Sequence, residues 1–286
     1  MNKLFKALEP ARSTLKTVQF SNSGLTPAYV ITYDLVHRAL EHQLLRNVVN
    51  LTSMRILNPG ATRFGGDNPR TTLKLVTMTC DVYVSPLRLV KPFFPQDSST
   101  LRKVNLTFSG LTPQDATWLF SYLPTTLQEL QIVLIMWTSS HLTLDEYQDR
   151  SHGATDRFPH QLLSRFSQLR SLCLMGFTLP VNLFVTLANL SSSIRRLKFY
   201  DSKWVPLDSS RSTRFPDHIS GILDPSFTIN LLSPFVHLVE LHLGTLPTLM
   251  IDRYSTLTAE MTRRGIEFDF EPCVEHEVCD ICGLRH

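Results

Sequence analysis

The segment CVEHEVCDICGLRH, residues 273–286, contains the one cluster of side chains in the sequence whose types and spacing suit a metal ion. Cys279 and Cys282 form a C-x-x-C pair, a spacing that lets two thiolates reach one tetrahedral zinc ion. Cys273, His276 and His286 are the side chains that could complete a set of four ligands, and we select Cys273 and His286. A zinc ribbon needs a second C-x-x-C pair, which this sequence lacks, so a reduced tail without metal is the alternative. We expect no cofactor apart from this candidate zinc.

Sequence motifs that carry enzymatic chemistry are absent. There is no G-x-S-x-G elbow, no glycine-rich phosphate loop and no H-E-x-x-H pair. The ten histidines and 25 acidic residues are dispersed along the chain. The adjacent acids Asp145 and Glu146 fall in a polar, loop-like stretch, where solvation is the simpler interpretation. The sequence therefore predicts a protein that is not an enzyme.

Composition restricts the class of partner. A formal net charge of +3, with the basic residues scattered, is too weak an electrostatic signal for nucleic acid. The most apolar run, IVLIMW at 132–137, is far too short to cross a membrane.

Five cysteines do not resemble a disulfide framework, and no secretory signal is evident at the N-terminus. We expect a reducing compartment, the cytoplasm or the nucleus.

A recurring apolar pattern indicates the elements that would position a binding surface. The segment LRSLCL, 169–174, has apolar residues at positions one, four and six, and positions four and six point to one side of a short strand. The pattern occurs in eight copies: LKTVQF (15–20), LTSMRI (51–56), LKLVTM (73–78), LRKVNL (101–106), LQELQI (127–132), LRSLCL (169–174), IRRLKF (194–199) and LVELHL (238–243). A ninth segment, IEFDF at 266–270, has only the alternation of apolar and polar residues that is typical of a strand, and we expect it to be the last strand.

The spacing of the copies predicts the fold. Successive copies start 36, 22, 28, 26, 42, 25 and 44 residues apart, and the short intervals lie near the leucine-rich-repeat period of about 20–29 residues. Helix-compatible stretches at 112–122 and 180–190 lie between strands. This alternation predicts an α/β leucine-rich-repeat solenoid, or horseshoe, with parallel strands on the concave side and helices on the convex side. The alternative is an ordinary α/β domain with unrelated amphipathic strands.

The domain organisation follows from the extent of the repeats. We expect a leucine-rich-repeat domain at 1–272 and a Cys/His-rich tail at 273–286. Two polar insertions interrupt the repeats near 138–158 and 201–225 and are too long for simple connectors in a compact fold. They are either loops that contact a partner or excursions without structure of their own.

The best repeat carries a resemblance to a known family. The segment LRKVNLTFSGLTPQDATWLFSYLPTT, 101–126, resembles the repeats of F-box/leucine-rich-repeat proteins, particularly the divergent fungal ones, in its strand, "SGLT" turn and "LFSYLP" helix. The segment RRGIEFDFEP, 263–272, is similar to the way such chains end. This resemblance implies the substrate-recognition part of an F-box-type ubiquitin-ligase receptor.

Two departures limit what the resemblance carries over. The family's usual asparagine or cysteine, three residues after the last strand leucine, is missing from every repeat, which predicts an irregular convex side. No recognisable F-box precedes Leu15, so a cullin-ligase adaptor is an expected partner only if an upstream F-box exists. A leucine-rich regulator of a small GTPase, or a scaffold solenoid with no ligase link, are the alternative functions.

The candidate partner-binding residues lie at positions three, five and seven of the repeats, which alternate with the buried positions. This face is polar and mixed in charge, which suits a protein partner better than a nucleic acid. For any single residue, simple solvation is the alternative. Cys173 should face the partner and react with thiol reagents. The candidate residues are Lys103, Asn105, Glu129, Gln131, Ser171, Cys173, Arg196, Lys198, Tyr200, Glu240 and His242.

Overall fold

Parallel β-strands form the frame of the protein. The computed structural model describes residues 10, 14–21, 53–57, 76–82, 100–108, 113–134, 160–180, 182–205, 225–246 and 251–272. The chain divides into two compact units, Met1–Trp137 and Thr138–His286, called here the first and second units. None of the helices in these ranges is long and apolar enough to cross a membrane.

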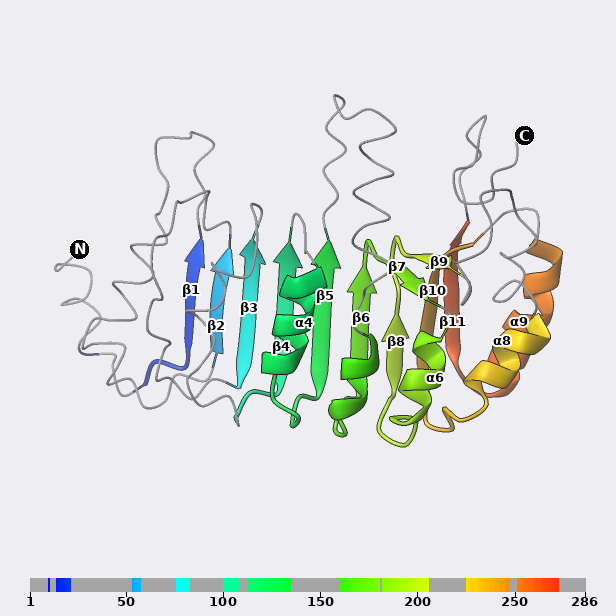
Figure 1. Ribbon diagram of the computed structural model, residues 1–286, viewed down its shortest axis with the longest axis horizontal. Coiled ribbons are helices and arrows are strands. Elements are labelled where there is room, and N and C mark those ends of the chain that lie inside the picture. Colours follow the sequence, from blue (N-terminus) through cyan, green and yellow to red (C-terminus); the bar gives the residue numbers. More distant parts are fainter. Residues whose placement is uncertain are drawn as a thin grey trace, which may run out of the picture. The chain divides into compact units, whose positions relative to one another are not determined.

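The described residues of the first unit form five parallel strands in chain order. Each strand pairs with the next one along the chain, and helix α4 connects β4 to β5 (Figure 1). Leu119 and Phe120 of α4 are fully buried, as is Leu123 directly after it, so α4 packs its apolar side inward. The elements are β1 (Thr17–Ser21), β2 (Ser53–Leu57), β3 (Thr77–Val82), β4 (Lys103–Phe108), α4 (Pro113–Tyr122) and β5 (Glu129–Leu134).

The second unit contains a parallel sheet in the order β6-β8-β10-β11, with helices on one side of it (Figure 1). Two short strands form a separate parallel pair: β7 follows β6 along the chain, and β9 follows β8. The elements are η3 (His160–Arg165), β6 (Ser171–Met175), β7 (Thr178–Pro180), α6 (Leu183–Ala188), β8 (Arg196–Lys198), β9 (Lys203–Val205), α8 (Pro225–Leu232), β10 (Glu240–Leu246), α9 (Ile251–Arg263) and β11 (Glu267–Pro272).

The apolar positions of the repeat form the core of each unit. In the repeat that starts at Leu101, the leucine at position one and the side chains of Val104 and Leu106 are fully buried, and burial alternates along β4. Leu169, Leu172, Leu174 and their counterparts in the following repeats are buried in the same way. The counterparts are Ile194, Leu197, Phe199, Leu238, Leu241 and Leu243.

The same pair of backbone hydrogen bonds recurs at the joint between one repeat and the next. The backbone carbonyl at position two accepts N–H bonds from positions two and three of the following repeat. Arg170 O, for example, accepts from Arg195 N at 2.8 Å and from Arg196 N at 3.0 Å. The same bonding occurs at Val76 O, Arg102 O and Arg195 O. This common joint, the buried apolar positions and the helices on one side confirm the predicted α/β leucine-rich-repeat architecture.

The third repeat differs from the predicted one by two residues. Met78 lies in register with Met54 and Val104, so it occupies position four, and Val76 is 38% exposed. The repeat is therefore LVTMTC, 75–80, and the predicted segment 73–78 is wrong. A shift of two residues leaves the same side chains on the same face of a strand, so the apolar pattern alone does not resolve it.

The structure defines the start of one helix and the end of another. Pro180 ends β7, and α6 begins at Leu183, so the predicted helix start at 180 is wrong; Pro180 lies in register with Val205 of β9. Helix α9 ends at Arg263, directly before Gly265 of the segment RRGIEFDFEP by two residues, and this glycine has φ +70°. Its N–H bonds to Thr262 O, and Ile266 N bonds to Met261 O, which is a Schellman motif at the end of α9.

Candidate partner-binding face

The sheet surface opposite the helices is called here the polar face, and it consists of strand positions three, five and seven. In the second unit it is built from rows of side chains that lie side by side in register. One row contains Ser171, Arg196, Glu240 and Glu267, and the next contains Cys173, Lys198, His242 and Asp269. The predicted residues of this unit are therefore neighbours on adjacent strands.

The polar face of the first unit has the same construction. Lys103 and Glu129 lie in register on β4 and β5, and their side chains form an ion pair of 2.6 Å. Asn105 and Gln131 are partners in the next row. These four predicted residues thus form one continuous polar area, in which a lysine and a glutamate neutralise each other.

An ion pair also lies at the centre of the second unit's polar face. Lys198 Nζ contacts Glu240 Oε1, and each side chain is about one-quarter exposed. The hydrogen bond to Glu240 is the main cause of a raised pKa at Lys198, against a smaller opposing effect of burial. Arg196, Glu267 and Asp269 are exposed around this pair. The surface presents both signs of charge, with the basic residues on β8 and the acidic ones on β10 and β11.

Cys173 occupies the predicted strand position, but its predicted exposure is wrong. It lies in register with Lys198, between the buried Leu172 and Leu174, and is only 9% exposed. Burial raises the pKa of its thiol to about 11, while the nearby positive charge of Lys198 acts in the opposite direction. The side chain of cysteine is short, so it stays below the longer side chain of Lys198 on the next strand.

His242 is likewise buried, with 5% of its surface exposed, where the sequence predicts an exposed partner contact. The ring of Tyr200 covers it, with ring centroids 4.2 Å apart. His242 Nδ1 accepts a hydrogen bond from Gly244 N at 3.2 Å, and Nε2 lies 3.7 Å from Glu271 Oε1. His242 therefore supports the polar face from below, and Tyr200 is the half-buried aromatic side chain above it.

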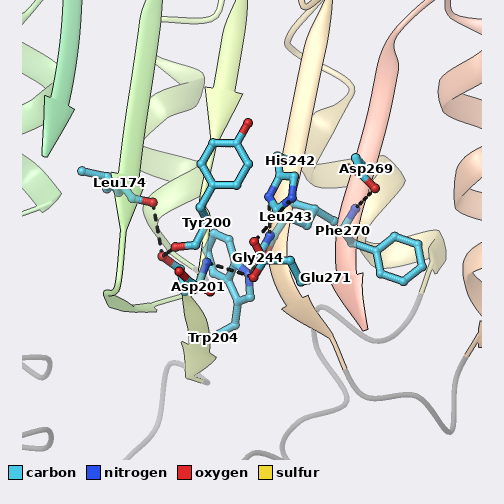
Figure 2. Close-up of polar contacts among 11 residues, drawn as sticks. Leu174, Tyr200, Asp201, Trp204, His242, Leu243, Gly244, Asp269, Phe270 and Glu271 are labelled. Carbon is cyan, nitrogen blue, oxygen red and sulfur yellow. Dashed lines mark hydrogen bonds and ion pairs between the residues drawn. The ribbon is translucent and has the colours of Figure 1, made fainter. Parts of the chain in front are cut away.

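Further contacts join the carboxyl ends of β8, β10 and β11, as Figure 2 shows. Glu271 Oε2 accepts the Asp201 N–H at 3.0 Å, and Trp204 Nε1 donates to Leu243 O at 2.6 Å. Asp201 has φ +46°, in the left-handed region. The group is called here the strand-end cluster, and its members are Tyr200, Asp201, Trp204, His242, Gly244 and Glu271.

Gly244 is required at its position in this cluster. Its φ is +77°, and a Cβ there would lie 2.2 Å from Phe199 O and 2.6 Å from Ser202 O. Two strands of backbone therefore approach each other more closely than any other residue would allow. This packing ties the end of β10 to the segment that follows β8.

Ser202 replaces part of the missing asparagine ladder. It is fully buried, and its hydroxyl oxygen accepts the Phe177 N–H at 3.3 Å. The same hydroxyl lies 3.0 Å from Tyr200 O and 3.3 Å from Leu174 O, either of which can accept its proton. A serine at the ladder position thus satisfies backbone hydrogen-bonding groups of the preceding repeat. The irregularity that the sequence predicts for the convex side is therefore not found at this junction between repeats.

Three acidic residues of β11 belong to the polar face in addition to those predicted from the sequence. Glu267 and Asp269 are exposed and in register with Glu240 and His242, and Glu271 follows at the next alternate position. The alternation of acids with Phe268 and Phe270 in IEFDFEP indicates that the acids share one face of the strand, and this pattern could have identified them. The other missed residues, Ser202, Trp204 and Gly244, act through partners distant in sequence.

Several predicted features lie outside the described residues. These are the candidate zinc ligands Cys273, Cys279, Cys282 and His286 and the insertion at 138–158. Within the described ranges, no group of three or more potential metal ligands is found. Of the insertion at 201–225, residues 201–205 contain β9, which pairs with β7.

Comparisons with known proteins give structural likenesses but no match in sequence. No protein-family model matches the sequence, and no curated protein matches it. Among solved structures, an internalin from Listeria monocytogenes is similar, with 11% sequence identity and a TM-score of 0.32. The likeness covers 92% of this chain and 84% of the internalin. The leucine-rich-repeat assignment rests on the repeating joints and core described above, and not on this match.

Proposed function

We propose that this chain is a non-catalytic protein-binding module whose polar face holds the partner. Leucine-rich repeats stack into extended surfaces of this kind, on which successive strands present alternate side chains. The observation that carries the proposal is the second unit's polar face, where Arg196, Lys198 and Glu240 lie side by side. Tyr200 adds a half-buried aromatic side chain, the type that often dominates the energy of protein interfaces.

The finer proposal is that the module recognises substrates of an F-box-type ubiquitin ligase. It is supported by the resemblance of residues 101–126 and 263–272 to F-box/leucine-rich-repeat proteins. In such a receptor the repeats hold the substrate, and a separate F-box contacts the ligase adaptor. No residue of this chain is assigned to adaptor binding.

The binding proposal is tested by comparing two charge reversals. Arg196→Glu changes an exposed arginine on the polar face, whereas Arg263→Glu changes an exposed arginine on α9. A partner is first captured with the wild-type chain, and its affinity is then measured for both variants. We expect Arg196→Glu to weaken binding about tenfold or more and Arg263→Glu to change it little. Equal effects of the two variants would contradict the polar face as the binding surface.

The ligase proposal needs an experiment of its own. The protein is isolated under native conditions from its source cells, and the associated proteins are identified by mass spectrometry. Co-isolation of a cullin and its adaptor, lost when ligase assembly is blocked, is the expected result. Association with a small GTPase, together with a change in its GTP hydrolysis, would replace the ligase proposal by the regulator alternative while leaving the binding face intact.

A further inference from the structure

The hydrogen bond between Gly244 and His242 fixes the protonation state of one ring nitrogen. Gly244 N–H is a donor, so His242 Nδ1 must offer a lone pair to it. The proton of the neutral ring then lies on Nε2, which faces Glu271 Oε1 at 3.7 Å. A second proton would have to bind at Nδ1. Two donors would then face each other across a contact that measures 3.2 Å between the nitrogens.

Charged groups surround His242 from every strand packed against it. On β8, Lys198 is its neighbour in register, and Tyr200 follows. On β11, Asp269 is its neighbour in register, and Glu271 lies beyond. Glu240 is on the same strand, and Asp201 lies in the turn before β9. His242 is therefore a buried ring whose Nδ1 is already occupied by the Gly244 N–H and whose Nε2 faces a carboxylate.

We propose that His242 is a pH-responsive switch that controls the conformation of the strand-end cluster. When the ring takes a proton from solvent at Nδ1, the Gly244 bond is lost and the imidazolium moves towards the Glu271 carboxylate. Gly244 cannot relax alone, because its backbone is packed against Phe199 O and Ser202 O. The segment between β8 and β9 must therefore move with the end of β10.

The motion reaches the polar face through two further contacts. Glu271 also accepts the Asp201 N–H, so a stronger attraction to His242 competes with that bond. Trp204 donates to Leu243 O, the carbonyl of the peptide unit whose N–H belongs to Gly244. Tyr200 lies against the ring of His242 and shifts with it. The switch is a property of the free chain, so it does not depend on the proposed binding function.

The test is a titration of the isotope-labelled full chain by NMR from pH 8 to pH 5, the range in which histidines change charge. The His242 ring, the Gly244 amide and the Trp204 indole N–H are followed together. We expect all three signals to move with one midpoint, and the Gly244 amide proton to move upfield as its bond is lost. Its hydrogen exchange, corrected for the intrinsic effect of pH, should become on the order of fivefold faster at the acid end.

Two variants separate this switch from a general effect of acid. His242→Asn keeps an acceptor near the position of Nδ1 but has no group that titrates in this range, so the Gly244 and Trp204 signals should stay constant. His237→Asn removes an exposed histidine that precedes β10 and should leave the wild-type transition unchanged. The proposal is overturned if the wild-type Gly244 signal does not follow His242, or if the His242→Asn variant shows the same transition.

Discussion

Lys198 and Glu240 form an ion pair that runs diagonally between strands. In register, Lys198 lies beside His242 and Glu240 lies beside Arg196, so the pair joins residues one row apart. The Lys198 charge is thereby directed towards β10 and away from solvent. The polar face of the second unit therefore has a neutralised centre, bordered by the exposed Arg196 on one side and the exposed acids of β11 on the other.

The partial burial of this pair predicts a measurable coupling energy. Lys198 and Glu240 are about one-quarter exposed, whereas Lys103 and Glu129 are 43% and 37% exposed. A double-mutant cycle with Lys198→Met and Glu240→Gln should give a coupling of about 1 kcal/mol in urea unfolding. The matched cycle at Lys103 and Glu129 should give about 0.3 kcal/mol and decrease more strongly in high salt. A larger coupling at the more exposed pair would contradict this assignment.

The buried thiol of Cys173 should react slowly. With a pKa of about 11 in place of 9.0, its thiolate fraction at pH 8 falls about 100-fold, and burial limits access further. Alkylation at pH 8, followed by peptide mapping, should show at least this difference between native and urea-unfolded protein. The Cys80 and tail cysteine peptides serve as internal comparisons. Rapid labelling of native Cys173 would show that its side chain is exposed.

The same thiol predicts a loss of stability in alkali. Its pKa is raised in the folded chain, so the folded state binds the proton more tightly, and the resulting stability is complete below about pH 9. It is lost as the pH rises towards 11, and the loss relative to pH 8 is about 1 kcal/mol at pH 10. Urea unfolding at both pH values should show this excess loss in the wild type over Cys173→Ala. Equal losses would contradict the buried, neutral thiol.

The sequence predicts the repeat architecture well because the information is local. The apolar residues at positions one, four and six are recognised within one short segment. In the repeats that start at Leu101 and Leu169 the residues at these positions are buried, as the pattern predicts. The sequence alone does not fix the third repeat, because segments 73–78 and 75–80 both place apolar side chains on the same face of the strand. Only pairing with Met54 and Val104 on neighbouring strands decides between them.

The site is less predictable because its geometry depends on residues far apart in the chain. Trp204 and Leu243 are 39 positions apart, and Asp201 and Glu271 are 70 apart. The sequence places His242 on the polar face, but only the ring of Tyr200 determines that it is covered. A strand pattern gives the side of the sheet, whereas exposure depends on the sizes of the neighbours on other strands.

The cysteines at 273, 279 and 282, with His286, predict one zinc ion per chain if the tail is a metal site. Metal analysis of protein purified without chelators should then give a stoichiometry near one. Cys279→Ser should lose the metal, because removing one thiolate weakens a tetrahedral site strongly. Cys80→Ser, outside the tail, should retain it. Substoichiometric zinc in the fully reduced wild type would instead favour the metal-free tail.

Two glycines with similar backbone angles give the sharpest test of the strand-end cluster. Gly244 and Gly265 have φ of +77° and +70°, so alanine at either position is strained by about 1–2 kcal/mol. At Gly265 a Cβ meets nothing within 4 Å, whereas at Gly244 it overlaps Phe199 O and Ser202 O. Both obstacles are backbone atoms and cannot rotate away, so Gly244→Ala should lose at least about 2 kcal/mol more than Gly265→Ala in urea unfolding. The Trp204 indole signal should shift only in Gly244→Ala. Similar losses in the two variants would show that the close approach of β10 to the end of β8 is not formed.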